Sequence, residues 1–222
     1  MVAYGIAMAG GEAAVVLYLR TLIGRIDPYQ PNPLPVFGGL SRAELVREAA
    51  TLIMLLAVGA LAGRTWRGRL GYSVIAFGVW DIFYYVFLKV LCGWPHSLAA
   101  WDILFLLPLP WWGPVWAPMS IALLMIVWGT LAVWSEDHGL AAAGHWSAAL
   151  ATAAGVLIAL YTFMADALRV AGRGEDALRN LLPVRFNWPL FCLGLLLMST
   201  PAAHLCWRFR RALMKRSTYE MA

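Results

Sequence analysis

The chain has 222 residues, of which 62% are hydrophobic and 13% are charged, and its formal net charge is +5. Its mean hydropathy is +0.70, whereas soluble globular domains carry about 45–50% apolar and about 25% charged residues. This composition excludes a water-soluble enzyme, a nucleic-acid-binding module and a disordered tail. It predicts an all-α, polytopic membrane helix bundle in which residues 1–222 form a single integral-membrane domain.

Apolar runs long enough to cross a bilayer recur along the chain. A helix needs about 20 mostly apolar residues to span the hydrocarbon layer. The runs that meet this requirement lie at 3–23, 43–63, 70–92, 115–134, 146–168 and 187–207. Residues 208–222 form a basic tail, and we expect it to anchor beside the last span rather than to bind nucleic acid.

Two proline-containing stretches interrupt this pattern. Residues 25–40 carry four prolines and cannot be helical throughout, so we expect a lid-like loop there. Residues 98–118 are apolar but broken by prolines, which predicts either a re-entrant half-helix or a short, broken seventh span. The loop at 135–145 is acidic and lacks Lys and Arg, and an outside position for it slightly favours seven spans over six. The other loop cations divide almost evenly between the two sides and do not fix the orientation.

The cysteines and histidines show no metal-binding pattern. Cys92, Cys192 and Cys206 have no C-x-x-C spacing and lie in or beside apolar runs, which argues against a disulfide framework and a thiolate site. The four histidines show no metal-ligand spacing. We therefore predict no metal.

Acidic residues within the apolar runs are the main indication of function, because a charge inside the bilayer is costly and usually faces a cavity or a partner. Glu12 lies near the middle of the first run and Asp81 near the middle of the third. Asp102 lies in the broken segment, and Asp166 lies toward the end of the fifth run. Arg20 is close enough to a span end for its side chain to reach the membrane surface.

Asp81 begins the most informative patch, Trp80-Asp81-Ile82-Phe83-Tyr84-Tyr85. Residues three and four positions apart share a helix face, so Tyr84 and Tyr85 flank Asp81. Lys89 keeps nearly the same face but stands about 12 Å along the helix axis, at 1.5 Å per residue. It is therefore too far away to pair with Asp81 within the helix.

A second Trp-Asp pair, Trp101-Asp102, repeats the pattern, and Tyr161 precedes Asp166. We therefore expect Glu12, Asp81, Asp102 and Asp166 to converge on one cavity lined by tyrosine and tryptophan. Desolvation favours the protonated form of a carboxyl group in apolar surroundings. A neutral carboxylic acid is what proton donation to an apolar substrate requires.

Structural roles are open for each of these acids. A buried Asp beside Tyr can lock two helices together through hydrogen bonds. Asp102 would serve as a helix cap if a helix begins there, and Asp166 would be an ordinary interfacial residue.

The run Gly78-Val79-Trp80-Asp81-Ile82-Phe83-Tyr84 resembles the Trp-Glu-x-x-Tyr patch of the integral-membrane terpene cyclases of meroterpenoid pathways. That family has a similar length and seven predicted helices. The resemblance extends to Trp101-Asp102 and to Asp166 behind Tyr161. This chain differs in having Asp for Glu, a longer first loop and the mid-span Glu12.

The resemblance implies a cyclisation that begins with protonation of an epoxide or alkene and uses no metal or organic cofactor. It implies that Asp81 is the acid and Asp166 the deprotonating base. It further implies that the rings of Trp80, Tyr84 and Trp101 shield cationic intermediates.

Three functions are compatible with these residues. The first is a membrane-embedded acid–base enzyme for a lipid-like or isoprenoid substrate, performing a cyclisation or isomerisation. In that case Asp81, Asp166, Asp102 and Glu12 are catalytic, and a set of neighbouring side chains binds the substrate: Trp80, Tyr84, Tyr85, Lys89, Trp101 and Tyr161. The second is a proton- or cation-coupled transporter or channel, and the third an accessory subunit of a membrane complex. We expect the lipid bilayer and a hydrophobic small molecule as partners, and a bacterial inner membrane as the location.

Overall fold

The computed structural model describes residues 1–31, 38–105, 109–138 and 146–220. Six helices in this part of the chain are long and apolar enough to cross a membrane, which confirms the all-α polytopic bundle. They are α1 (Val2–Leu22), α2 (Gly38–Ala62), α3 (Trp66–Cys92), α4 (Trp116–Asp137), α5 (Trp146–Val170) and α7 (Trp188–Glu220). The protein is thus an integral membrane protein, and the slight preference for seven spans was wrong.

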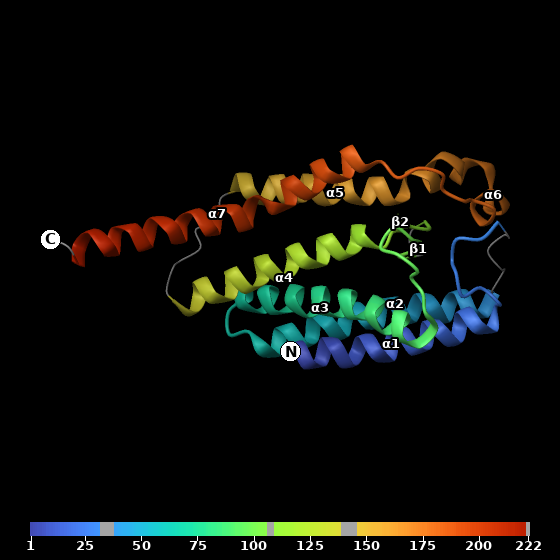
Figure 1. Cartoon of the computed structure of the whole chain (residues 1–222), viewed down its shortest axis with the longest axis horizontal. Helices are drawn as coiled ribbons and strands as arrows, with labels where there is room; N and C mark the ends of the chain where they lie inside the picture. The colour runs from blue at the N-terminus through green and yellow to red at the C-terminus, as the bar shows by residue number, and fades with distance from the viewer. Residues whose placement is uncertain (32–37, 106–108, 139–145, 221–222) are drawn as a thin grey trace.

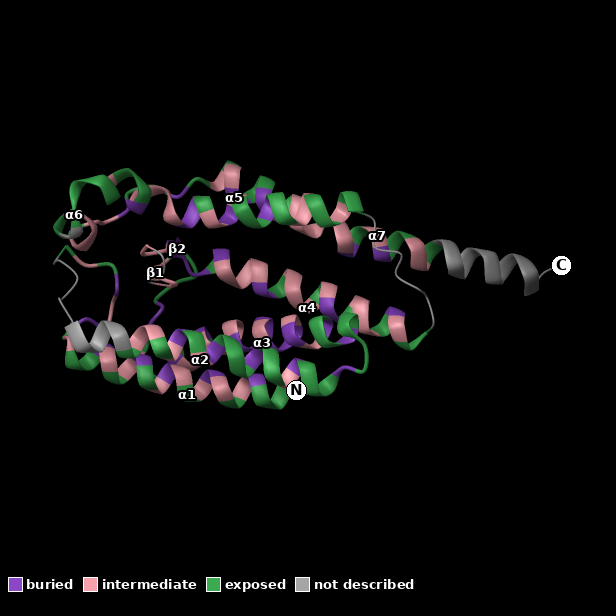
Figure 2. Ribbon diagram, turned by 180° about the vertical axis from the view of Figure 1, so that it is seen from behind, coloured by how far each residue is buried: buried purple, intermediate pink, exposed green. Residues whose placement is uncertain are grey.

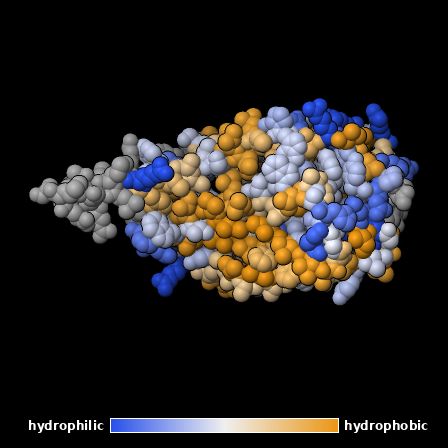
Figure 3. Space-filling model, in the orientation of Figure 1, coloured by the Kyte–Doolittle hydropathy of each residue, from blue (hydrophilic) through white to orange (hydrophobic). Residues whose placement is uncertain are grey.

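The bundle has two halves joined by α4 (Figures 1 and 2). In the first half, α3 packs against α1, α2 and α4. In the second half, α5 packs against α7, and α7 also contacts α4. A single 3-10 turn (Ala171–Arg173) and the short helix α6 (Glu175–Arg179) connect α5 to α7. Apolar side chains cover the middle of the visible face and polar ones gather toward its two ends (Figure 3), as a transmembrane bundle requires.

Helix α3, which carries the Trp80-to-Tyr85 patch, is closed at both ends by local hydrogen bonds. The Thr65 side chain accepts a hydrogen bond from the Gly68 amide and caps the N-terminus. Gly93, at φ +75°, ends the helix in the left-handed conformation and donates its amide to the carbonyl of Lys89. These caps fix the length of α3, and with it the depth at which the patch lies.

The described residues between 98 and 115 form neither a half-helix nor a seventh span. Strand β1 (Trp101–Ile103) pairs antiparallel with β2 (Trp112–Pro114), with Asp102 opposite Gly113. Additional bonds from the Leu104 amide to the Trp111 carbonyl and from the Trp111 amide to the Phe105 carbonyl continue the pairing. The chain therefore turns back on itself as a hairpin whose two strands pair with one another through backbone hydrogen bonds.

The predicted lid-like loop is shorter than expected, because α2 begins at Gly38; residues 32–37 lie outside the described part of the chain. The preceding segment is held in place. Arg25 donates hydrogen bonds to the carbonyls of Pro28 and Gln30, and the Tyr29 hydroxyl donates to the Pro183 carbonyl at 2.8 Å. This segment therefore connects the two halves of the bundle. The basic tail continues α7 as a helix to Glu220.

Glycines permit the close approach of neighbouring helices. A Cβ atom on Gly78 of α3 would lie 2.5 Å from the Ala122 carbonyl oxygen of α4. A Cβ atom on Gly155 of α5 would lie 2.5 Å from the Gly194 carbonyl oxygen of α7. Small residues at such contacts allow the backbones to pack directly.

This packing predicts that Gly78→Ala destabilises the protein by about 1–3 kcal/mol, because the added methyl group forces α3 and α4 apart. Gly11→Ala is the matched control, since nothing lies within 4 Å of a Cβ atom there. The control should leave the melting temperature in detergent unchanged or slightly raised. Equal melting temperatures for the two variants would show that the α3–α4 contact is not close.

Candidate functional site

A cavity of about 290 Å³ lies between the two halves of the bundle. We call it the central cavity. One side is polar and comes from α1, α2, α3 and β1; its polar members are Glu12, Arg47, Glu48, Thr51, Asp81, Tyr84, Tyr85 and Asp102. The other side is apolar and comes from the hairpin, α4, α5 and α7; it includes Leu104, Phe105, Trp111, Pro118, Ile121, Met125, Val156, Phe163 and Met198.

Asp81 differs from the other acids in the cavity. Its side chain is half-buried and lines the cavity. Among the residues that the structure describes, none forms a hydrogen bond or an ion pair with its carboxyl group. An acid in apolar surroundings without a partner is suited to hold a proton and to release it to a bound molecule.

Glu12 is held by groups of α2. Its carboxylate forms an ion pair with Arg47, and the Thr51 hydroxyl lies 3.4 Å from both carboxylate oxygens. Arg47 also forms an ion pair with Glu44, one turn earlier on α2. Glu12 therefore lies in a charged cluster between two helices and is paired as a carboxylate.

Asp102 forms the second ion pair of the cavity. The guanidinium of Arg20 donates a 2.7 Å hydrogen bond to the Asp102 carboxylate, which also accepts one from the Ile103 amide. Arg20 is only 8% exposed, so its guanidinium is buried inside the protein instead of extending outward as expected. Burial raises the pKa of the Asp102 carboxyl, and the adjacent guanidinium acts in the opposite direction. Because no helix begins at Asp102, its predicted role as a helix cap is wrong.

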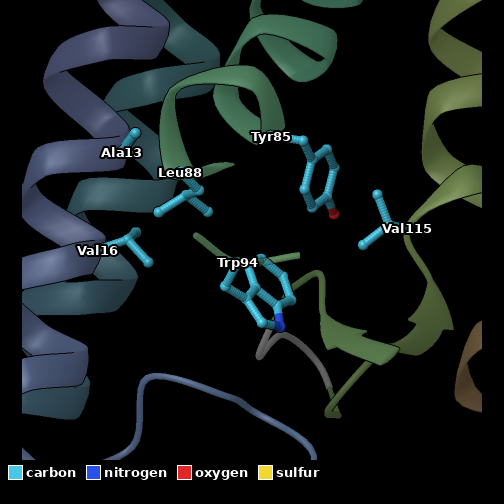
Figure 4. Packing of buried hydrophobic residues seen from close by; sticks show 6 residues of the cluster. All are labelled: Ala13, Val16, Tyr85, Leu88, Trp94 and Val115. Carbon is cyan, nitrogen blue, oxygen red and sulfur yellow. The ribbon is translucent and has the colours of Figure 1, made fainter. Parts of the chain in front are cut away.

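Aromatic residues surround these charged groups. In Figure 4, the ring of Tyr85 lies above the ring of Trp94, and Val115 lies beside Tyr85. The centroids of the two rings are 6.2 Å apart. The Arg20 guanidinium lies 4.2 Å from the centroid of Trp94, a cation–π contact that partly replaces its lost hydration. On the neighbouring turn, Trp80 and Tyr84 stack at 6.2 Å. The aromatic wall predicted from the α3 patch is therefore present beside Asp81.

Several buried indole groups lack an acceptor. The Nε1 atoms of Trp80, Trp94, Trp111 and Trp112 are buried and have no hydrogen-bond partner among the described residues. Two of these residues, Trp80 and Trp111, line the central cavity. Unsatisfied donors of this kind are uncommon in folded proteins, and here they cluster around the cavity and the hairpin.

The remaining predicted site residues lie elsewhere. Asp166 does not line the cavity and forms an i,i+3 ion pair with Arg169, so the four carboxylates do not all converge. Tyr161 is 50% exposed on α5. Trp101 does not line the cavity; its ring stacks on that of Tyr29. Lys89 is exposed, and its ammonium group donates to the carbonyl of Gly93 at the end of α3.

The residues that α2 contributes to the cavity were not predicted from the sequence. Arg47 and Glu48 are adjacent, Thr51 lies about one helical turn further along α2, and all three line the cavity. Arg47 was interpreted only as one of the loop cations, and no role was predicted for Glu48 or Thr51. The i,i+4 spacing of Arg47 and Thr51 and the i,i+3 spacing of Glu48 and Thr51 were the signal that could have identified this face of α2. In the described part of the chain, no three His, Cys, Asp or Glu side chains are grouped so that they could hold a metal ion.

Comparison of the chain with protein-family models, curated proteins and solved structures gives no match. The resemblance to terpene cyclases is thus neither supported nor opposed by a relative. Function has to be argued from the central cavity itself.

The buried ion pair leads to a stability prediction. Asp102→Asn should lower the free energy of unfolding by about 3–5 kcal/mol, because Arg20 then remains as a buried charge without a counterion. Asp166→Asn breaks an ion pair whose arginine side chain is 74% exposed, and should change stability by about 0–1 kcal/mol. Unfolding of both variants by a denaturing detergent checks this. Similar losses would indicate that Arg20 finds water or another partner.

Proposed function

We propose that the protein is a membrane-embedded acid–base enzyme that cyclises or isomerises a lipid-like or isoprenoid substrate, with Asp81 as the proton donor. The observation that carries the proposal is the contrast within one cavity. Glu12 and Asp102 are paired with arginines, whereas Asp81 has no partner among the described residues. Pairs of acids in such different environments are typical of acid–base sites.

The reaction that fits this contrast is an isomerisation in which no atoms are gained or lost overall. Protonation of an epoxide oxygen or an alkene carbon by Asp81 generates an electron-poor carbon, and an internal alkene attacks that carbon to form a ring bond. Loss of a proton from a neighbouring carbon then restores a double bond. Glu12 and Asp102, which arginines hold in the charged form, line the same cavity and are the candidates to accept that proton.

The cavity wall supports a substrate of this kind. The faces of Trp80 and Tyr84 beside Asp81 can stabilise positive charge on carbon without offering a nucleophile. The apolar side, from Phe163 to Met198, suits a hydrocarbon chain. Asp166 lies outside the cavity, so the base role that the resemblance implied for it is not part of this proposal.

A bacterial inner membrane is part of the proposal as well. A bundle of apolar helices is the architecture that spans such a membrane, whereas the bacterial outer membrane is spanned by β-barrels. The arginines at the helix ends suit its anionic surface. The cavity lies within the bilayer-spanning bundle, where a hydrophobic substrate is dissolved at high local concentration.

The proposal predicts that Asp81→Asn lowers turnover by roughly 100-fold or more, the usual contribution of a general acid. Lipids that co-purify with the protein are identified by mass spectrometry, and the terminal epoxide of geraniol serves as the defined probe. Cyclisation gives a product of unchanged mass and altered retention. In D₂O, protonation of an alkene carbon adds one non-exchangeable deuterium, whereas protonation of the epoxide oxygen adds none.

Asp81→Glu should recover part of the activity, and Asp166→Asn should retain nearly all of it. The proposed enzymatic activity would be contradicted if Asp81→Asn turned over substrate at the wild-type rate. It would also be contradicted if neither the probe nor the co-purifying lipids gave an isomerised product. Transport is checked in the same preparation. A proton flux into liposomes that needs Asp81 and runs without product formation would support a transporter instead.

A further inference from the structure

The charged groups of the central cavity all belong to its polar side. Among the described residues, the lining contains the carboxyl groups of Glu12, Glu48, Asp81 and Asp102 and one cationic side chain, Arg47. Arg20 adds a second cation behind Asp102. Arg47 pairs with both Glu12 and Glu44, and Arg20 pairs with Asp102, so among the described residues these acids outnumber the arginines that bind them. An anionic ligand group would be repelled at this side, because charges act strongly on one another where water is excluded.

The arginines are also already occupied. Arg47 is bound to Glu12 and to Glu44, and Arg20 is bound to Asp102 and to the Ile26 carbonyl. Neither guanidinium offers the open pair of donors with which arginine normally binds a phosphate or carboxylate. The carboxylates, in contrast, are acceptors that a hydroxyl or ammonium group can bind.

None of the described residues that line the opposite side of the cavity is charged. Met125 of α4, Val156 of α5 and Met198 of α7 lie there beside Phe163. Flexible methionine side chains adapt to irregular hydrocarbon chains. The cavity thus has a polar end toward α1–α3 and an apolar end toward α4, α5 and α7.

We propose that the central cavity binds a short, single-chain amphiphile with a non-anionic, hydrogen-bond-donating head, an alcohol or an amine, and that it rejects the matching carboxylate and phosphate. The head lies toward Glu12 and Asp81, and the hydrocarbon chain lies toward α4, α5 and α7. The volume of about 290 Å³ is near the lower end of known ligand pockets, which suits a chain of monoterpene size. This inference rests on the function proposed for the same cavity.

Four probes with one hydrocarbon chain test the inference: geraniol, geranylamine, geranic acid and geranyl phosphate. Each is titrated into the full-length protein in nanodiscs of uncharged lipid, and binding is followed by tryptophan fluorescence, to which Trp80 and Trp111 of the cavity contribute. Empty nanodiscs correct for partition into lipid. We expect the alcohol and the amine to bind at least tenfold more tightly than the acid and the phosphate.

Two variants locate the probes in the cavity. Glu12→Gln removes a carboxylate and leaves Arg47 with one partner fewer, so the anionic probes should gain several-fold in affinity. Val156→Phe fills the apolar end of the cavity and should lower the affinity for geraniol and for geranylamine to a similar extent. Glu136→Gln is the control, because Glu136 accepts a hydrogen bond from Thr65 at the start of α3 and does not line the cavity.

Anionic probes that bind as tightly as the neutral ones would overturn the inference, and so would the absence of binding by all four. An unchanged preference in Glu12→Gln would also overturn it. Failure of the proposed enzymatic function can be distinguished from failure of the inference about the ligand. If the alcohol and amine bind as expected while Asp81→Asn retains turnover, the ligand class stands and the catalytic role of Asp81 is lost.

Discussion

The ion pair between Arg20 and Asp102 is the interaction on which the arrangement of the site depends. It joins α1 to a hairpin that is distant in sequence, and β2 of this hairpin contacts both α4 and α5. Two buried charges lose much of their hydration, and a single contact rarely offsets this loss. Here Trp94 lies on the guanidinium, and the Ile103 amide binds the carboxylate. The pair thus holds the hairpin where it closes one end of the central cavity.

The same constraint explains the α1–α2 contact. Glu12, near the middle of an apolar helix, would be unfavourable if it faced lipid, and Arg47 and Thr51 of α2 provide the partner and the nearby hydroxyl. Arginine is suited to this position because its planar head binds two carboxylates at once. The Glu12–Arg47 pair therefore joins two helices of the first half, while the second half packs through small and aromatic residues such as Gly155 and Phe163.

The parts of the structure that could be predicted were those that local sequence determines. Six apolar runs and the aromatic patch around Asp81 follow from composition and helical spacing. The ends of the six runs agree with those of α1 to α5 and α7 within a few residues in most cases. The hairpin could not be predicted, because its apolar, proline-containing strands look like a broken helix. The partners of Glu12 and Asp102 could not be predicted either, because the contacting residues are distant in sequence. Thr51 is 39 positions from Glu12, and Arg20 is 82 positions from Asp102.

Asp166 shows why charge within an apolar run is an incomplete guide to function. Near the end of its helix it binds Arg169, whose side chain extends to the surface, so its position needs no cavity. Asp81 has no such explanation. Asp81 lies on α3 next to Trp80, Tyr84 and Tyr85, which line the same cavity. No described residue pairs with its carboxyl group. A structural role would require a hydrogen bond to another helix, and no described residue of another helix forms one with Asp81.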